Sequence, residues 1–173
     1  PPISSMEEIV AKLIEYTPQF DIPYILLGHS LGAKIAFEYM KSLAKSGFAL
    51  PCYFIASASS APTLTSQMYS KYPLDEAQVV AELGVLGGTP PEILQSKELM
   101  SLLMPSLLAD FNIAASYRDT EGFSVSIPLC LMAGEQDMRI DLAELPAWKQ
   151  SFNGTCQTHI VDDGHFFIET SRD

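Results

Sequence analysis

The sequence predicts an α/β fold with a mostly parallel β-sheet and helices on both faces. Apolar runs without polar alternation, such as 22–27, 50–56 and 127–133, are typical of strands buried on both faces of a parallel sheet. Stretches with helical spacing of apolar residues separate these runs, and such alternation favours an α/β domain. The length of 173 residues suits one domain, and a hydrophobic share of 47% is enough for a core.

Local signals predict where the elements begin and end. Ser4 and Ser5 precede two glutamates, which is typical of a helix start, and Pro18 ends that helix. Gly47 closes a later helical pattern, and Pro105 is expected to interrupt another. The other expected elements are a strand over 22–27, a helix over 31–46, strands over 50–56, 127–133 and 157–161, a Ser/Pro/Thr-rich loop over 57–73, helical structure over 75–118 broken at 87–91, a helix over 141–152, and a short helix or loop from 165.

The composition disfavours some classes of function. The net charge of −11 argues against nucleic acid and against anionic membrane surfaces as partners, because both need a basic footprint on the protein. No apolar run reaches the roughly 18 residues of a membrane-spanning helix. The three cysteines, Cys52, Cys130 and Cys156, form no metal-ligand pattern, and we expect buried free thiols in a reducing, cytoplasmic compartment.

A G-x-S-x-G motif, Gly28-His29-Ser30-Leu31-Gly32, stands between a predicted buried strand and a predicted helix. A turn of this kind exposes the serine hydroxyl, so Ser30 is a candidate nucleophile. We expect Gly28 and Gly32 to avoid collisions with the neighbouring strand and helix. The backbone N–H of Leu31 would face the oxyanion of a substrate. The alternative is an ordinary helix cap, in which the Ser30 side chain binds a backbone N–H.

His165 is the predicted base that a serine nucleophile needs. It follows the last predicted strand, and functional loops in open α/β sheets lie at the carboxyl ends of strands. The other two histidines have less suitable positions. We expect His29 to pack and to form a hydrogen bond behind the turn, and His159 to be an ordinary strand residue.

Asp137 is the predicted acid, because it follows the predicted strand 127–133. Its role would be to hold the imidazole tautomer of His165 and to stabilise the imidazolium. The chain order Ser30, Asp137, His165 is the order found in α/β-hydrolases. The alternative acids in neighbouring loops are Glu135, Asp141, Asp162 and Asp163.

With these residues in place, the chain resembles the type II thioesterases, stand-alone α/β-hydrolases that work beside polyketide synthases and non-ribosomal peptide synthetases. The resemblance covers nearly the whole chain. It rests on the segments GHSLGAKIAFE, LGVLGGTPPEIL, MPSLLADFNIAASYR, LMAGEQD and DGHFFI, in that order. It implies Ser30 as nucleophile, Asp137 as triad acid and His165 as base.

The resemblance also implies a substrate and a domain plan. The substrate would be an acyl thioester on the phosphopantetheine arm of an acyl or peptidyl carrier protein, hydrolysed without a metal or cofactor. The chain would be one α/β-hydrolase domain over 1–173 with a helical lid over about 62–118. The rival interpretations are a general carboxylesterase or lipase of the same fold, and an inactive fragment or binding module. Apolar lid residues would line an acyl pocket or pack the lid onto the domain, namely Leu99, Met100, Leu102, Leu103, Met104, Leu107, Leu108 and Phe111.

Members of that family carry further sequence before the segment that begins here, including the first strands of the sheet and a second oxyanion donor. We therefore expect the strand over 22–27 to be an exposed apolar edge. The missing N-terminal part of the same protein, or another chain, would complete it.

Overall fold

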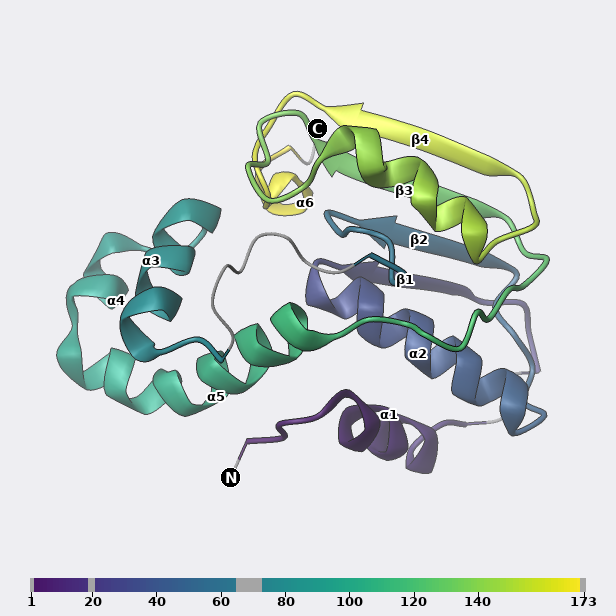
Figure 1. Ribbon diagram of the computed structural model, residues 1–173, viewed down its shortest axis with the longest axis horizontal. Helices are drawn as coiled ribbons and strands as arrows, with labels where there is room; N and C mark the ends of the chain where they lie inside the picture. Colours follow the sequence, from purple (N-terminus) through teal and green to yellow (C-terminus); the bar gives the residue numbers. More distant parts are fainter. Residues whose placement is uncertain (1, 19–20, 65–72, 172–173) are drawn as a thin grey trace.

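A computed structural model of the protein describes residues 2–18, 21–64 and 73–171. Its centre is a four-stranded sheet in the order β1-β2-β3-β4, in which every neighbouring pair is parallel (Figure 1). All four predicted strands are confirmed, with ends shifted by a few residues. The strands are β1 (Ile25–His29), β2 (Tyr53–Ser57), β3 (Leu129–Gly134) and β4 (Cys156–Val161).

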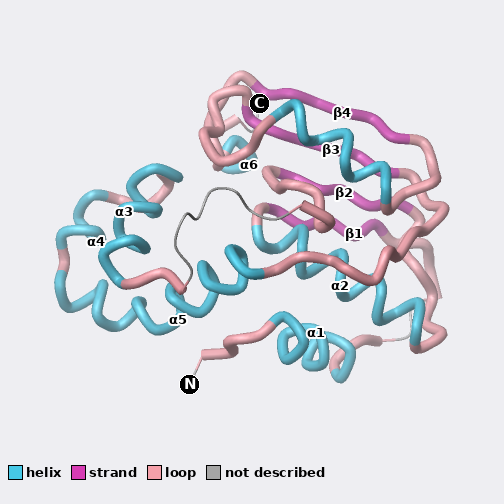
Figure 2. The backbone as a smooth tube through the Cα atoms, in the orientation of Figure 1, coloured by secondary structure: helices cyan, strands magenta, loops and turns pink. Residues whose placement is uncertain are grey.

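Helices pack on the sheet and extend beyond its carboxyl end (Figure 2). Helices α2 and η1 lie side by side on one face of the sheet, and α1 packs on α2. Helices α3, α4 and α5 form a group inserted between β2 and β3, beside the carboxyl ends of the strands (Figure 1). The helices are α1 (Met6–Glu15), α2 (Leu31–Lys45), α3 (Glu76–Leu86), α4 (Pro91–Gln95), α5 (Lys97–Ser116), η1 (Leu142–Gln150) and α6 (Phe167–Thr170).

An aromatic cluster joins α2, β2 and η1 in the core. Phe37, Phe54 and Trp148 are fully buried, and Phe152 is nearly so. The ring centroids of Phe54 and Phe152 lie 5.1 Å apart, and those of Phe37 and Trp148 lie 6.1 Å apart. The indole N–H of Trp148 donates to the carbonyl of Ser59 at 3.0 Å. The core therefore also fixes the loop that follows β2.

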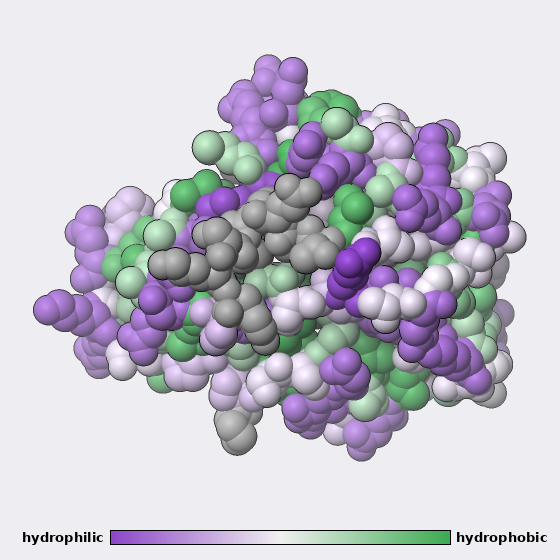
Figure 3. All heavy atoms as spheres, viewed as in Figure 1, coloured by the Kyte–Doolittle hydropathy of each residue, from purple (hydrophilic) through white to green (hydrophobic). Residues whose placement is uncertain are grey.

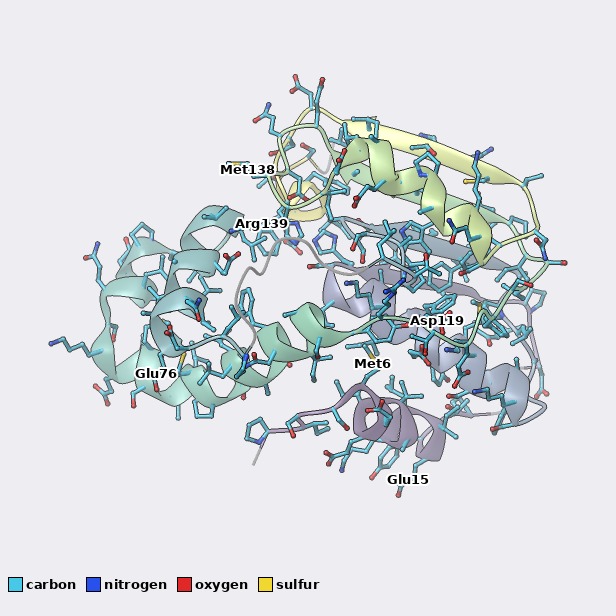
Figure 4. The ribbon with its side chains drawn as sticks, in the orientation of Figure 1. Met6, Glu15, Glu76, Asp119, Met138 and Arg139 are labelled. Carbon is cyan, nitrogen blue, oxygen red and sulfur yellow. The ribbon has the colours of Figure 1, made fainter. Side chains whose placement is uncertain are left out.

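A buried network of charged groups ties the chain leaving α5 to helix α2. Lys41 Nζ lies 2.6 Å from Asp119 Oδ1 and 2.8 Å from Glu38 Oε1. The Tyr117 hydroxyl donates to the same Glu38 oxygen at 2.7 Å. Figure 4 shows Asp119 on the segment that runs beside α2. Because each charge has an opposite partner, the network fixes the return path to β3 without leaving this ammonium unpaired.

Two helical segments differ from the sequence prediction. Pro105 does not interrupt its helix, because α5 runs through it without a break. Pro105 and Ser101 are both exposed, so water can bind the Ser101 carbonyl that loses its helical partner. The predicted helix over 141–152 is a 3₁₀-helix, η1, and Pro146 inside it lacks an N–H to donate.

The cysteines are free, as expected, but they differ in burial. Cys130 on β3 is buried, whereas Cys156 is half-buried. The expectation that Cys52 is buried is wrong. It precedes β2 at the surface, where its thiol donates to the Tyr24 carbonyl at 3.2 Å.

Helix α5 is long and apolar enough to cross a membrane, by length and composition alone. Buried helices of soluble proteins pass the same test. Met100 and Met104 of α5 pack in a cluster with Val79 of α3, and Ile113 packs in a cluster with Val10 of α1. Apolar side chains at both ends of α5 therefore pack against other parts of the protein.

Strand β1 stands at the edge of the described sheet. It pairs with β2 and with no other strand among residues 2–18, 21–64 and 73–171. Its side chains alternate, so Leu26 packs against the core while Ile25 and Leu27 are 59% and 49% exposed. The expected exposed apolar edge is therefore present. The face of the molecule that Figure 3 shows carries hydrophilic residues mixed with apolar ones.

We predict that Phe37→Ala lowers the free energy of unfolding by about 3–5 kcal/mol, because it empties a fully buried site between α2 and η1. Chemical denaturation followed by circular dichroism measures this change. Tyr16→Ala is the matched control, since Tyr16 is 79% exposed and the change there should stay within about 0.5 kcal/mol. Equal losses in the two variants would contradict the assignment of the core.

Candidate active site

The corner at Ser30 joins β1 to α2 through a strained backbone. Ser30 has φ 55° and ψ −124°, a combination that non-glycine residues rarely adopt. Its N–H donates to the carbonyl of Ser57 at the end of β2, at 2.8 Å. Its side chain forms no helix-capping hydrogen bond. The alternative of an ordinary helix cap therefore does not apply, and the hydroxyl projects from a turn of the kind that G-x-S-x-G motifs form.

The two glycines of the motif differ in their surroundings. A Cβ at Gly28 would overlap the Gly32 carbonyl oxygen and the backbone of Ala33. The expectation of a similar collision at Gly32 is wrong, because a Cβ built there meets no described atom within 4 Å apart from its chain neighbours and the backbone of its own helix. The close approach of strand and helix at this corner therefore depends on Gly28 alone.

Ser30, His165 and Asp137 form one chain of hydrogen bonds. His165 Nε2 lies 3.0 Å from Ser30 Oγ, and His165 Nδ1 lies 2.7 Å from Asp137 Oδ2. An ionised carboxylate can only accept, so Nδ1 carries the proton and Nε2 of the neutral ring accepts from the serine hydroxyl. His165 and Asp137 are each 5% exposed. The fold thus brings together three side chains that the sequence places in three separate loops.

Backbone contacts hold the loops after β3 and β4 together. A Cβ at Gly134 would overlap the carbonyl oxygens of Asp163 and Gly164, so the two loops can approach this closely only with glycine at that position. Asp137 Oδ1 accepts from the N–H of Arg139 at 2.8 Å. This second hydrogen bond leaves the other carboxylate oxygen directed at the imidazole.

The alternative acids have other partners or face solvent. Asp163 accepts from the hydroxyls of Ser171 and Thr170 and from the N–H of Gly164. These hydrogen bonds, that of Ser171 first, lower the pKa of the Asp163 carboxyl. The other three are Asp162, which accepts from the Gln136 amide, Asp141, which caps η1, and Glu135, which is exposed.

The remaining histidines occupy different positions. His29 Nδ1 lies 2.9 Å from Ser57 Oγ, so the expected hydrogen bond behind the turn is confirmed. Its ring also contacts that of His165, with centroids 5.2 Å apart. Burial, followed by the neighbouring His165, lowers the pKa of His29. His159 is an exposed residue of β4.

A cavity of about 330 Å³ opens onto Ser30 and His165. Leu31, the first residue of α2, also lines it, and the N–H groups of a first helical turn have no partner within the helix. Among the predicted apolar lid residues, Phe111 lines this cavity, whereas Met100, Met104, Leu107 and Leu108 pack within the insertion. The other walls are formed mainly by Lys34, Ala58, Leu86, Ala114, Ile140 and Phe166.

The insertion contacts the site at two further points. Arg139, in the loop after β3, pairs with Glu82 of α3 at 2.5 Å, and Figure 4 shows Arg139 between α3 and the end of the sheet. Gly88 has φ 76°, and a Cβ there would lie 2.6 Å from the ring of Phe166. The insertion therefore contacts the loop of the acid and the neighbour of His165.

The described part of the chain contains no group of three or more histidine, cysteine and acidic side chains placed to hold a metal ion. The site has its own set of reactive groups. It combines a serine hydroxyl, a hydrogen-bonded imidazole and a carboxylate beside a largely apolar cavity.

Comparison with known proteins agrees with this arrangement. A family model described as thioesterase domain matches residues 1–173. The chain is 30% identical over 172 residues to the gramicidin S biosynthesis protein GrsT of Aneurinibacillus migulanus, covering 99% of this chain and 67% of that protein. The chain thus spans about two thirds of the length of this relative.

Solved structures of other proteins resemble this chain as well. ClbQ, from the colibactin NRPS/PKS pathway, superposes with a TM-score of 0.86 at 26% identity, covering 99% of this chain and 73% of ClbQ. YbtT, a type II thioesterase from the yersiniabactin NRPS/PKS biosynthetic pathway, superposes with a TM-score of 0.82 at 31% identity, covering 99% of this chain and 71% of YbtT.

The parallel sheet, the corner at Ser30 and the helical insertion define an α/β-hydrolase. Within that class the chain belongs to the thioesterase domain family, whose members hydrolyse thioester bonds. The fold class and the resemblance to type II thioesterases are confirmed by these comparisons.

Two residues of the site were missed in the sequence. Arg139 supplies the N–H that binds Asp137 and the guanidinium that pairs with Glu82. Lys34 lines the cavity and is one of two lysines among the buried residues of α2, the other being Lys41. The sequence did carry a signal for Lys34, because this lysine lies in the first turn of the helix that follows Ser30.

We predict that Gly28→Ala lowers the free energy of unfolding by about 1–3 kcal/mol, because the added methyl meets backbone atoms that cannot move aside easily. Gly32→Ala, in open space, should be neutral or stabilise α2 by up to about 1 kcal/mol. Thermal and chemical denaturation of both variants measure the difference. A loss of stability in Gly32→Ala as large as in Gly28→Ala would contradict this account of the corner.

Proposed function

We propose that the chain hydrolyses acyl thioesters held on the phosphopantetheine arm of an acyl or peptidyl carrier protein. Ser30 is the nucleophile, His165 the base and Asp137 the acid that orients it. One observation carries this proposal: the hydrogen-bonded series of these three side chains opens onto a largely apolar cavity in a chain of the thioesterase family. No metal or cofactor has a role in it.

The first half of the reaction forms an acyl-enzyme. His165 Nε2 takes the proton of Ser30 as Oγ attacks the thioester carbonyl, and the N–H of Leu31 donates to the developing oxyanion. Asp137 stabilises the imidazolium through Nδ1. The C–S bond then breaks, the imidazolium of His165 gives its proton to the leaving sulfur, and the thiol departs while the acyl group remains on Ser30.

The second half releases the acid. A water molecule gives a proton to His165 Nε2 and attacks the acyl-Ser30 carbonyl. Collapse of the tetrahedral intermediate returns the proton to Ser30 Oγ and frees the carboxylic acid. The same three groups serve both halves, so each turnover restores the hydrogen bonds seen in the structure.

The carrier-bound substrate is supported by the relatives. ClbQ and YbtT come from NRPS/PKS pathways, where acyl units travel on carrier proteins. We place the reaction in the cytoplasm, with no nucleic acid or membrane as partner. The segment over about 62–118 acts as the lid of this site, because its helices contact Arg139 and Phe166 beside the triad.

We predict that Ser30→Ala abolishes release of free acid from an acyl-loaded carrier protein, because no other group replaces the nucleophile. Mass spectrometry of the carrier follows the loss of the acyl group. An oxygen ester of the same acyl group is tested in parallel. Faster Ser30-dependent cleavage of the oxygen ester would favour a general carboxylesterase, and release that persists in Ser30→Ala would refute the serine mechanism.

We predict that Asp137→Asn lowers kcat by up to about 10⁴-fold, because an amide favours the wrong imidazole tautomer at His165. Asp163→Asn is the matched control, since its carboxylate binds Thr170 and Ser171 instead of the imidazole. Steady-state rates of both variants measure the contrast. The assignment of the acid fails if Asp163→Asn is the more damaging change.

A further inference from the structure

Lys34 is a buried lysine in the wall of the cavity. It is 5% exposed, and it lines the same space as Ser30 and His165. Ser30 immediately precedes α2 and Lys34 lies in the first turn of that helix, so the two residues stand close together along the cavity wall. Lys34 is thus part of the wall of the space that an acyl group attached to Ser30 would enter.

No acidic side chain in the described part of the chain forms an ion pair with Lys34. Its recorded contact is the ring of Tyr117, whose centroid is 5.9 Å from Nζ. Lys41, two turns further along α2, is equally buried but lies within 4.0 Å of three carboxylates. The chain therefore neutralises one buried lysine and leaves the other, in the cavity wall, without a carboxylate partner among the described residues.

A buried charge without a partner costs free energy, so this arrangement favours any ligand that brings an anion to it. Burial lowers the pKa of Lys34 to about 8, which leaves the amine mostly protonated at pH 7. Asp110 lines the same cavity from α5, but it is exposed and makes no ion pair with Lys34. The surface of the cavity is mainly apolar, so a carboxylate on the substrate can supply the counter-ion that Lys34 lacks.

We propose that Lys34 selects acyl groups that carry a carboxylate beyond the thioester carbonyl, that is, half-thioesters of dicarboxylic acids. This proposal rests on the proposed function of the site. The acyl chain would run from Ser30 along the first turn of α2, and its carboxylate would bind the ammonium. One helical turn of about 5.4 Å matches an acyl chain of moderate length, such as adipyl.

The test compares adipyl and hexanoyl thioesters on the same carrier protein, with a blank without enzyme. The two acyl chains have equal length and differ in the terminal carboxylate. The wild-type protein should show a kcat/KM for adipyl about tenfold or more above that for hexanoyl, as a charge-assisted hydrogen bond implies. Lys34→Met should invert this ratio, because it removes the cation and leaves an apolar wall.

Lys45→Met is the matched control. Lys45 is another lysine of α2, but its side chain is 61% exposed and pairs with Glu121 outside the cavity, so the wild-type ratio should persist. A ratio that is the same in Lys34→Met as in wild type overturns the proposal. If Lys34→Met does not fold, the wild-type ratio alone decides, since a value of one or below also overturns it.

The pH profile gives an independent readout. The ratio of kcat/KM values for the two acyl groups should fall as the pH rises past about 8, because the free enzyme then loses the ammonium. Contributions of the triad cancel in this ratio, since both substrates use it. The other titratable groups that face Lys34 or the cavity are Tyr117, Asp110, Arg139, His29 and His165.

The outcomes separate the two proposals. If neither acid is released in a Ser30-dependent reaction, the proposed function itself is refuted. Ser30-dependent release of both acids without preference for adipyl would leave that function intact and refute the role of Lys34.

Discussion

The strained corner at Ser30 is the constraint on which the rest of the site depends. A backbone with φ 55° costs about 1–3 kcal/mol and persists only where the surroundings impose it. Here they do so from two sides: Ser57 accepts the N–H of Ser30, and Gly28 lets the strand and helix approach. Burial of Phe37 and Met40 on α2, about 1.5–3 kcal/mol each, exceeds that cost. The packing of the core thus holds Ser30 in a strained backbone conformation, and its hydroxyl does not cap the helix.

The polar groups around this corner are divided between structure and chemistry. Lys41 pairs with Glu38 and Asp119, and these ion pairs fix the path of the chain from the insertion to β3. Asp137 is held by a backbone N–H on one oxygen and by His165 on the other. Lys34 has no such partner among the described residues, so it is the charged group of α2 that remains for a ligand.

The sequence predicted the positions of the strands and selected three side chains that the structure joins by hydrogen bonds, because both depend on local patterns. The expected burial of the first strand on both faces is wrong, since Ile25 and Leu27 are exposed. An apolar run without alternation predicts a buried strand, and a residue directly after such a run lies at the functional edge of the sheet. That logic selected Ser30, Asp137 and His165 without knowledge of their distances, and in the structure His165 forms hydrogen bonds with both of the others.

The failures of prediction concern solvent exposure and long-range contacts. Pro105 was expected to break a helix, but an exposed carbonyl one turn earlier makes the lost hydrogen bond inexpensive. Gly32 was expected to be crowded, which depends on where neighbouring atoms lie. The pairing of Arg139 with Glu82 joins residues far apart in the chain, and no local pattern predicts it.

The position of the triad relative to the strands has one more consequence. Ser30 follows β1, His165 follows β4, and these are the two outer strands of the described sheet. With neighbouring strands about 4.8 Å apart, a hydrogen bond of 3.0 Å closes a span of about 14 Å across the whole edge. The distance between Oγ and Nε2 therefore reflects the twist and order of all four strands. Fraying at either outer strand therefore moves Ser30 away from His165 while the aromatic core between the strands is still packed.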